Sequence, residues 1–184
     1  MRPKPWRPTR AQLEAARGKT IKDLIRPGLD VLFVGINPGL YTAAIAHHFG
    51  RPGNRFWPAL SASGLLNAPL TAWQSEKLLD SNLGMTNLVS RATARADELD
   101  KDELRQGAQV LTRKMLLYKP RIAAFLGFGL YRDAFARPNA SAGLQTERIG
   151  QTLLWVFPNP SGLNARFQVP DYARLFREMA RFLR

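Results

Sequence analysis

The sequence predicts an α/β fold: a three-layer α/β/α sandwich around a short, mainly parallel central sheet of about four strands. Two observations support this prediction. Short apolar runs alternate along the chain with segments of helical periodicity, which is typical of strands joined by helical crossovers. The runs, as in 31–34 and 153–157, are apolar throughout, and such runs indicate parallel strands that helices cover on both faces.

The first part of the chain is predicted to lead through helical segments into the first strand. Helical patterns cover about 10–18 and 20–25 and stop at a Pro-Gly pair, after which 31–34 forms a strand. The segment 40–54 is interrupted by glycine and proline and is predicted to be irregular. A helix over 55–63 follows, because its apolar positions fall on one face.

The remainder continues the alternation. The helix over 101–118 has the clearest signal, since its apolar residues recur at helical spacing and a proline follows its end. Polar loops are predicted over 90–100 and in the glycine-containing stretch before 153–157. The other predicted elements are a helix over 72–79, a strand over 84–89, a strand over 122–126, a helix over 130–135, a strand over 153–157 and a helix over 171–183.

Length and charge indicate one domain that binds a polyanion. The 184 residues contain no internal Pro/Gly/Ser-rich linker, so a single domain over 10–184 is expected after a flexible basic leader over 1–9. Lys and Arg total 27 against 14 Asp and Glu, a formal charge of +13, which favours nucleic acid as the partner. The sequence has no long apolar stretch and no secretory segment, so we expect no membrane partner and a cytoplasmic location.

The composition excludes several kinds of chemistry. Cysteine is absent, which excludes disulfides, thiolate metal sites and a cysteine nucleophile. His47 and His48 are the only histidines, and adjacent side chains are poorly placed to chelate one metal ion, so we predict no metal. No Walker or complete dinucleotide-binding motif occurs, and we predict no cofactor.

Two Asn-Pro turns, Gly35–Gly39 and Pro158–Leu163, each follow a predicted strand directly. Ligands of open α/β sheets bind beyond the carboxyl ends of the strands, where both turns are expected to lie. Asn37 could hold a water molecule with its carboxamide, and Leu163 could enter a base stack as an apolar wedge. The alternatives are an ordinary structural turn for Asn37 and packing within the domain for Leu163.

Taken together, the motifs resemble a known family. They occur in the order Gly35–Leu40, Phe49 with Pro52–Trp57, Gly84–Val89 and Pro158–Leu163. This ordered set is similar to the mismatch-specific uracil-DNA glycosylases, which are related to thymine-DNA glycosylase. The resemblance implies a DNA glycosylase that flips uracil out of the duplex, especially from U·G mispairs, with T·G pairs and other damaged pyrimidines as further substrates. It would hydrolyse the N-glycosidic bond, and we expect a monomer acting on double-stranded DNA.

The resemblance also implies roles for single residues. Asn37 matches the asparagine that positions the attacking water, Phe49 an aromatic residue that stacks on the flipped base, and Leu163 the wedge, with Gly162 allowing close backbone approach. The remaining substrate-binding predictions are Gly35, Ile36, Asn87 and Asn159. The remaining DNA-binding predictions are Ser161, Asn164, Arg166, Arg55 and Arg91, with Arg51 and Arg95 as further phosphate partners.

This chain departs from the family pattern at two positions. Members often carry an arginine three residues after the first wedge glycine, but Ala165 stands there and Arg166 follows it. Asn87 stands where some relatives have a lysine. These departures leave the contact to the opposite strand and the substrate range open.

A carboxylate near Asn37 would supply a general base, since a carboxamide does not ionise near neutral pH. Asp97, in the loop over 90–100, is the preferred candidate, with Glu98 and Asp80 as weaker ones. The competing interpretation of Asp97 is a solvated loop residue or a helix cap. No lysine is placed for Schiff-base chemistry, so a monofunctional enzyme without lyase activity is predicted.

Two other classes of function are compatible with parts of the sequence. A non-catalytic nucleic-acid-binding module would explain the charge and the aromatic residues, but not the Asn37 turn. A nucleoside hydrolase would share the glycosidic chemistry, but needs neither a wedge nor a charge of +13.

Overall fold

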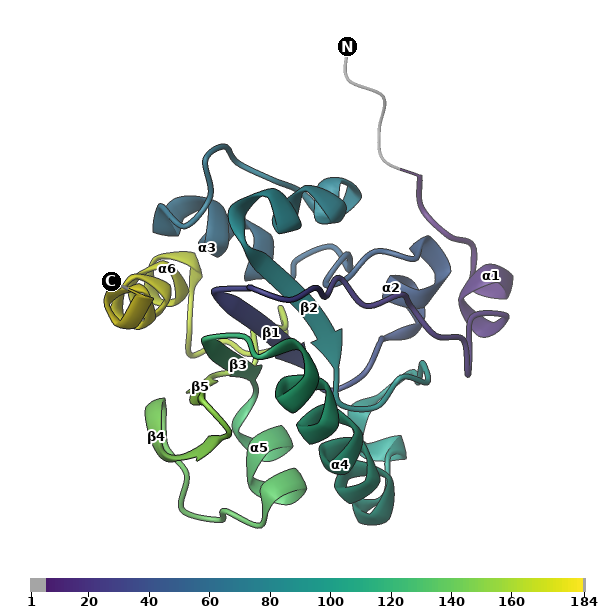
Figure 1. Cartoon of the computed structure of the whole chain (residues 1–184). Helices are drawn as coiled ribbons and strands as arrows, with labels where there is room; N and C mark the ends of the chain where they lie inside the picture. The colour runs from purple at the N-terminus through teal and green to yellow at the C-terminus, as the bar shows by residue number, and fades with distance from the viewer. Residues whose placement is uncertain (1–5, 184) are drawn as a thin grey trace.

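The computed structural model describes residues 6–183 and is built on one five-stranded sheet with the strand order β2-β1-β3-β5-β4. The sheet crosses the middle of the molecule (Figure 1). The strands are β1 Val31–Gly35, β2 Leu83–Asn87, β3 Ile122–Leu126, β4 Gly143–Ile149 and β5 Thr152–Phe157.

The first, second, third and fifth strands are parallel and in close register. Val31 of β1 is paired with Leu83 of β2 on one side and with Ile122 of β3 on the other. The same alignment continues from β3 to β5. The carboxyl ends of these four strands therefore lie along one edge of the sheet, as the continuous apolar runs predicted.

The strand β4 corrects the sequence prediction, because the sheet has five strands instead of about four. It pairs antiparallel with β5, and its residues alternate between half-buried and exposed. An edge strand with one wet face needs only every second residue to be apolar. The segment therefore resembled a polar loop, and its glycine reinforced that interpretation.

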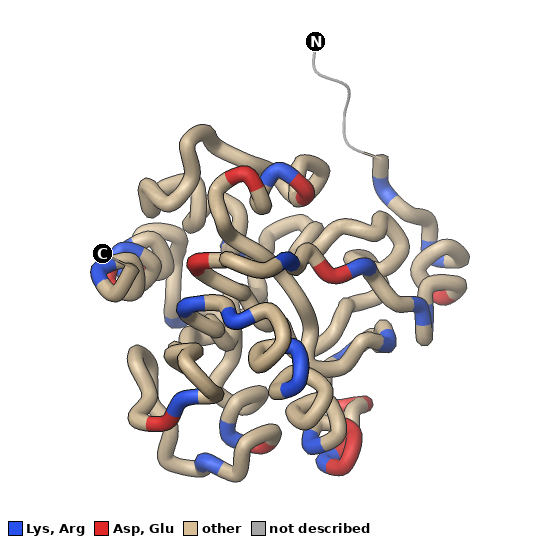
Figure 2. The backbone as a smooth tube through the Cα atoms, viewed as in Figure 1, with Lys and Arg blue, Asp and Glu red and all other residues tan. Residues whose placement is uncertain are grey.

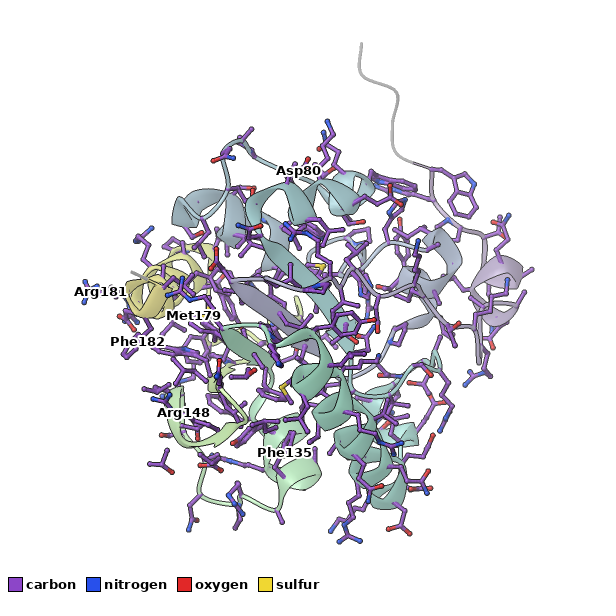
Figure 3. The ribbon with its side chains drawn as sticks, viewed as in Figure 1. Asp80, Phe135, Arg148, Met179, Arg181 and Phe182 are labelled. Carbon is purple, nitrogen blue, oxygen red and sulfur yellow. The ribbon has the colours of Figure 1, made fainter. Side chains whose placement is uncertain are left out.

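Helices cover both faces of the sheet (Figure 1). Val31 and Phe33 of β1 belong to one apolar cluster with α3 and α6, whereas Leu32 and Val34 belong to a second cluster with α4 and α5. Met179 of α6 is fully buried in the first cluster, while Arg181 points away from the molecule in Figure 3. The longer helices are α3 Phe56–Ser63, α4 Lys101–Tyr118, α5 Phe128–Phe135 and α6 Val169–Ala180.

The other helices are α1 Arg10–Glu14, α2 Leu40–Ile45 and the 3-10 helices η1 Ala72–Ser81, η2 Ala96–Glu98 and η3 Arg181–Leu183. Two predictions near the N-terminus were wrong. The segment 20–25 is extended, because Leu24 and Met85 exchange backbone hydrogen bonds of 2.9 Å. The segment 40–54, predicted to be irregular, contains α2.

The predicted leader is described only in part, since residues 1–5 lie outside the described residues; Thr9 is the N-cap of α1. Lysine and arginine positions are scattered along the backbone trace in Figure 2, and the 27 basic residues outnumber the 14 acidic ones. Charge alone therefore does not single out a DNA-binding face. No helix in the described range combines the length and apolarity that crossing a bilayer requires.

Candidate active site

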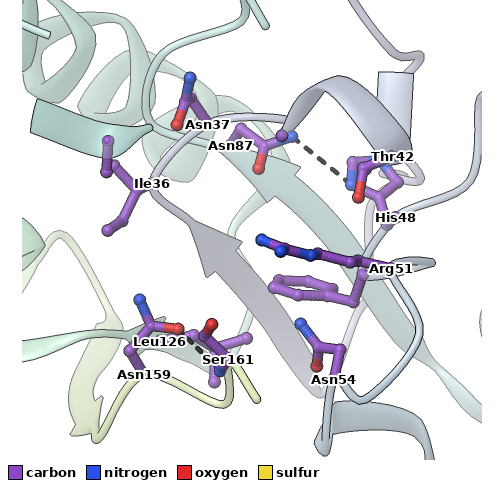
Figure 4. Close-up of a pocket in the computed structure, with 13 residues that line it drawn as sticks. Ile36, Asn37, Thr42, His48, Arg51, Asn54, Asn87, Leu126, Asn159 and Ser161 are labelled. Carbon is purple, nitrogen blue, oxygen red and sulfur yellow. Dashed lines mark hydrogen bonds between the residues drawn. The ribbon is translucent and has the colours of Figure 1, made fainter. Parts of the chain in front are cut away.

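A pocket of about 160 Å³ opens at the carboxyl edge of the parallel strands (Figure 4). It is formed by the segments that follow β1, β2, β3 and β5. Seven of the residues predicted from the sequence line it together: Ile36, Asn37, Phe49, Arg51, Asn87, Asn159 and Ser161. The two Asn-Pro turns thus meet at one site, although 121 residues separate Asn37 from Pro158 in the chain (158 minus 37).

The carboxamide of Asn37 is held in one orientation. Its Nδ2 donates to the backbone oxygen of Arg91 at 3.0 Å and to Oγ1 of Thr93 at 2.7 Å. The Thr93 hydroxyl donates its own proton to the backbone oxygen of Arg95, so it can only accept from Asn37. The nitrogen is therefore committed to the loop after β2, and Oδ1 faces the ring of lining residues in Figure 4.

Phe49 lines the pocket. One face of its ring is stacked on Phe56, with ring centroids 4.7 Å apart and an interplanar angle of 21°. The backbone of Phe49 has a φ of 52°, a left-handed conformation that costs a non-glycine residue about 1–2 kcal/mol. This strained backbone and the stacking contact together fix where a planar ligand could stack.

Gly35 was predicted to bind substrate, but it lies beneath the pocket and does not line it. A Cβ atom at this position would lie 2.6 Å from Oδ1 of Asn87 and 3.1 Å from Cζ of Phe49. Both distances are shorter than ordinary van der Waals contact. Glycine is therefore required here because two lining side chains pass directly over the strand.

His48 orients Asn87, a relationship that the sequence did not predict. The imidazole is 2% exposed, and its Nε2 lies 3.1 Å from the backbone oxygen of Lys22. Since a carbonyl oxygen only accepts, Nε2 carries the proton, and Nδ1 of the neutral ring accepts from Nδ2 of Asn87 at 3.5 Å. Burial lowers the pKa of His48, which favours this neutral form. Oδ1 of Asn87 is consequently the atom that faces inward.

A second hollow of about 210 Å³ adjoins the pocket and shares Arg51, Asn54 and Ser161 with it. Gly162 and Leu163 line this hollow, and Leu163 is 82% exposed. An apolar side chain so exposed contributes nothing to the core of its own domain. Leu163 therefore does not pack within its own domain, which was the alternative interpretation of this residue.

The segment Asn159–Gln168, here called the wedge loop, is tied to α6. The hydroxyl of Tyr172 donates to the backbone oxygen of Asn159 at 2.6 Å and accepts from Nδ2 of Asn164 at 3.2 Å. Burial raises the pKa of Tyr172 to about 12, so the phenol remains a donor at neutral pH. The side chain of Asn164, predicted to bind DNA, thus faces the inside of its own loop.

Three of the five arginines predicted to contact DNA differ in their surroundings. Arg166 is exposed and lies over the ring of Phe167, with 5.8 Å between Cζ and the ring centroid. Arg91 is forked onto Glu103, with hydrogen bonds of 2.6 and 2.7 Å. Arg55 donates to the backbone oxygen of Ser161 at 2.8 Å. Arg91 and Arg55 therefore already have partners within the protein.

The structure does not place Asp97 in the pocket. Its carboxylate is exposed and paired with Arg95, and only the neighbouring Ala96 lines the cavity. Glu98 is paired with Arg17 at 2.7 Å, and Asp80 lies at the surface just before the start of β2, at the opposite edge of the sheet (Figure 3). Among residues 6–183, no carboxylate lines this pocket.

Sequence reasoning missed His48, Thr42 and Asn54 as lining residues and Thr93 as the anchor of Asn37. The position of His48 next to Phe49 was the one available signal, but the histidine pair was considered only as a metal site. Within the described range, no group of three or more potential metal-ligating residues occurs.

A family model and a solved structure each match most of this chain. The family model described as the uracil DNA glycosylase superfamily matches residues 22–184. A solution NMR structure of a candidate uracil DNA glycosylase from Methanosarcina acetivorans has a similar fold, with a TM-score of 0.55 and 19% sequence identity. The similarity covers 88% of this chain and 98% of that one.

Proposed function

We propose that this chain, which belongs to the uracil DNA glycosylase superfamily, is a monofunctional glycosylase that hydrolyses the bond between uracil and deoxyribose in DNA. Uracil mispaired with guanine is the proposed principal substrate, and the protein acts as a monomer. The observation that carries the proposal is the shared pocket. There, the fixed oxygen of Asn37 and the ring of Phe49 lie beside the hollow lined by Leu163.

The size and position of the pocket suit a nucleotide that has left the duplex. Extrusion of a base costs a few kcal/mol, least where the pair is mismatched, which favours U·G over U·A. Insertion of Leu163 into the stack would replace part of the lost contact. Stacking of the extruded base on Phe49 would offset a further part.

Asn87 supplies a hydrogen-bond acceptor to the edge of the base. Because His48 fixes its amide, Oδ1 faces the site and can accept from the N3–H group of uracil. Cytosine carries a lone pair at N3, which would be placed against another lone pair. The pocket therefore disfavours normal cytosine without needing to exclude it by size.

The reaction needs an ordered water and a stabilised leaving group. Oδ1 of Asn37 accepts a hydrogen bond from the water, whose oxygen bonds to C1′ as the bond between C1′ and N1 breaks. The bonding electron pair leaves with the base as an anion, and the water loses a proton to solvent. Since no carboxylate among residues 6–183 lines the pocket, departure of the base and development of an oxocarbenium-like sugar precede most of the bond formation to water.

The test of this proposal uses one sequence context with U·G, U·A, T·G and C·G pairs, together with free deoxyuridine. The expected result is uracil release from duplexes, fastest from U·G, with an intact abasic strand as the other product. Strand cleavage would contradict the monofunctional assignment. Release from free deoxyuridine at a comparable rate would favour a nucleoside hydrolase, and tight DNA binding without any release would favour a binding module.

A further inference from the structure

Arg55 connects the two hollows of the site. It precedes α3 and lies between Asn54, which lines both hollows, and Phe56, on which Phe49 stacks. The side chain is half-buried, and it points to the wedge loop. Its hydrogen bonds therefore join the start of α3 to the segment that carries Leu163.

Three hydrogen bonds make this connection. The backbone N–H of Arg55 donates to the backbone oxygen of Pro160 at 2.9 Å, and Nη1 donates to the backbone oxygen of Ser161 at 2.8 Å. Nε lies 3.3 Å from Oε1 of Gln168, at the far end of the wedge loop. The guanidinium thus spans the loop from its beginning to its end.

Backbone packing reinforces the same junction. A Cβ atom at Gly162 would lie 2.7 Å from the backbone oxygen of Gly53, so the two loops touch without intervening side chains. Nε2 of Gln168 donates to the backbone oxygen of Ala165 at 2.9 Å, which holds the return half of the loop. Leu163 is consequently presented from a loop that is fixed on both sides.

A wedge residue works only if its loop resists the duplex that it enters. A loop free to fold back would yield when Leu163 met the base stack, and ordering it during binding would reduce the gain from insertion. A guanidinium that is always charged and donates in a rigid fork is suited to holding backbone oxygens in place. A lysine at this position would keep the charge and lose the fork.

We propose that Arg55 is a positioning residue, which holds the wedge loop against the base pocket so that Leu163 enters the duplex as a base occupies the pocket. This inference rests on the proposed glycosylase function. It replaces the sequence prediction that Arg55 contacts DNA. Its effect on catalysis is exerted through Leu163 and not through a phosphate group.

The experiment compares Arg55→Lys, Arg55→Gln, Leu163→Ala and the double variant Arg55→Gln/Leu163→Ala. Single-turnover uracil release from a U·G duplex gives the rate, and 2-aminopurine beside the uracil reports base extrusion. Binding is measured as a function of salt concentration. Arg174→Gln on α6, where Arg174 is paired with Glu178, serves as the control for loss of one positive charge.

The proposal predicts that Arg55→Lys and Arg55→Gln both slow release by about 10- to 100-fold, as expected for lost charge-assisted hydrogen bonds. Both should also reduce the 2-aminopurine signal. In the Leu163→Ala background, Arg55→Gln should have little further effect, because the residue through which it acts is absent. The salt dependence of binding should stay at its wild-type slope.

Three results would overturn the proposal: wild-type rates for Arg55→Lys, a salt slope shallower by about 0.9 for Arg55→Gln as for a lost phosphate contact, or fully multiplicative effects of the two substitutions. Thermal unfolding of each variant shows whether it is folded. If Arg55→Gln does not fold, Gln168→Ala removes one of the three contacts and should give a smaller loss of the same kind. Failure of the wild type to release uracil would instead refute the proposed function itself.

Discussion

Nδ2 of Asn37 donates to Oγ1 of Thr93 at 2.7 Å, and the hydroxyl of Thr93 donates onward to the backbone oxygen of Arg95 at 2.7 Å. The direction of this chain of bonds is fixed, because a backbone oxygen cannot donate. The reactive side of the Asn37 amide is therefore set by a buried threonine in the loop after β2. Thr93 and the backbone of Arg95, which do not line the pocket, thus determine where Asn37 can bind a water molecule.

Thr93→Val tests this orientation. Valine keeps the shape of threonine but cannot accept from Asn37, so the amide loses one of its two anchors. We expect single-turnover uracil release to slow by about 5- to 30-fold, the effect of one neutral hydrogen bond at a buried group, while DNA affinity is retained. Thr93→Ser should restore most of the rate, and equal losses for valine and serine would contradict the account.

His48 predicts a pH dependence. Its pKa is lowered, mainly by burial, so the ring stays neutral in the native protein down to a pH below the ordinary imidazole value of about 6.5. Protonation of Nδ1 would remove the acceptor for Asn87. We expect the rate to be constant above about pH 6.5 and to fall in more acidic buffer, with the fall abolished in His48→Gln; a decline already present between pH 8 and 7 would contradict this.

The same shift affects stability with a definite sign. In acid, the unfolded chain takes up a proton on His48 that the native state resists, so the free energy of unfolding decreases as pH falls below about 6.5. Denaturant unfolding at pH 7.5 and 5.5 should show a larger decrease for the wild type than for His48→Gln. Equal decreases would show that His48 does not contribute.

Gly35→Ala should displace the side chains of Asn87 and Phe49, which pass directly over Gly35. The added methyl group would lie 2.6 Å from Oδ1 of Asn87, and overpacking of this kind typically destabilises by about 1–3 kcal/mol. Displacement of Asn87 and Phe49 should also weaken uracil binding. The matched control is Gly129→Ala in α5, where a Cβ atom meets nothing within 4 Å. It should leave base release unchanged and should not destabilise the fold, since alanine is the better helix former.

Asp97 offers a direct test of the general-base hypothesis. A carboxylate acting as the base contributes about 100- to 10,000-fold, whereas an exposed ion pair with Arg95 contributes little. From its position outside the pocket, we expect Asp97→Asn to change single-turnover release by less than about twofold. A loss of 100-fold with unchanged affinity would show that this carboxylate reaches the site when DNA is bound.

Residues 1–19 precede the part of the chain that the family model matches, yet we predict that they stabilise the loop that holds Asn37. Arg17 is paired with Glu98 at 2.7 Å, and Gly18 donates to the backbone oxygen of Ala92 at 2.9 Å, beside the residues that hold Asn37. Removal of residues 1–19 should slow release more than it weakens DNA binding. A proportional loss of affinity without a change in single-turnover rate would indicate that the segment acts only through its charge.

Much of the fold was predictable because it depends on local pattern. The continuous apolar runs of β1 and β5 and the Asn-Pro turns after them were recognised, and these turns do meet at one pocket. The strand β4 was missed because a half-exposed edge strand needs few apolar residues. The extended segment around Leu24 was missed because its conformation is set by pairing with Met85, 61 residues later (85 minus 24).

The sequence predicted several residues that share the pocket, but not the orientation of their side chains. Arg55 and Arg91 were predicted to contact DNA because the sequence shows their charge, but it does not show which groups of the protein they bind. Ser161 lies 106 residues from Arg55, and Glu103 lies across a loop from Arg91. Likewise, the link from Lys22 through His48 to Asn87 joins three separate segments, and its directionality follows only from which atoms are near each other.

The measurement that tests the central claim most directly is single-turnover release of uracil from a U·G duplex by wild type and Asn37→Ala, with DNA binding measured in parallel. The account predicts rapid release by the wild type and a loss of at least about 100-fold in Asn37→Ala at nearly unchanged affinity, because only the placement of water is removed. Release by Asn37→Ala at the wild-type rate, or none by a folded and DNA-bound wild type, would contradict it.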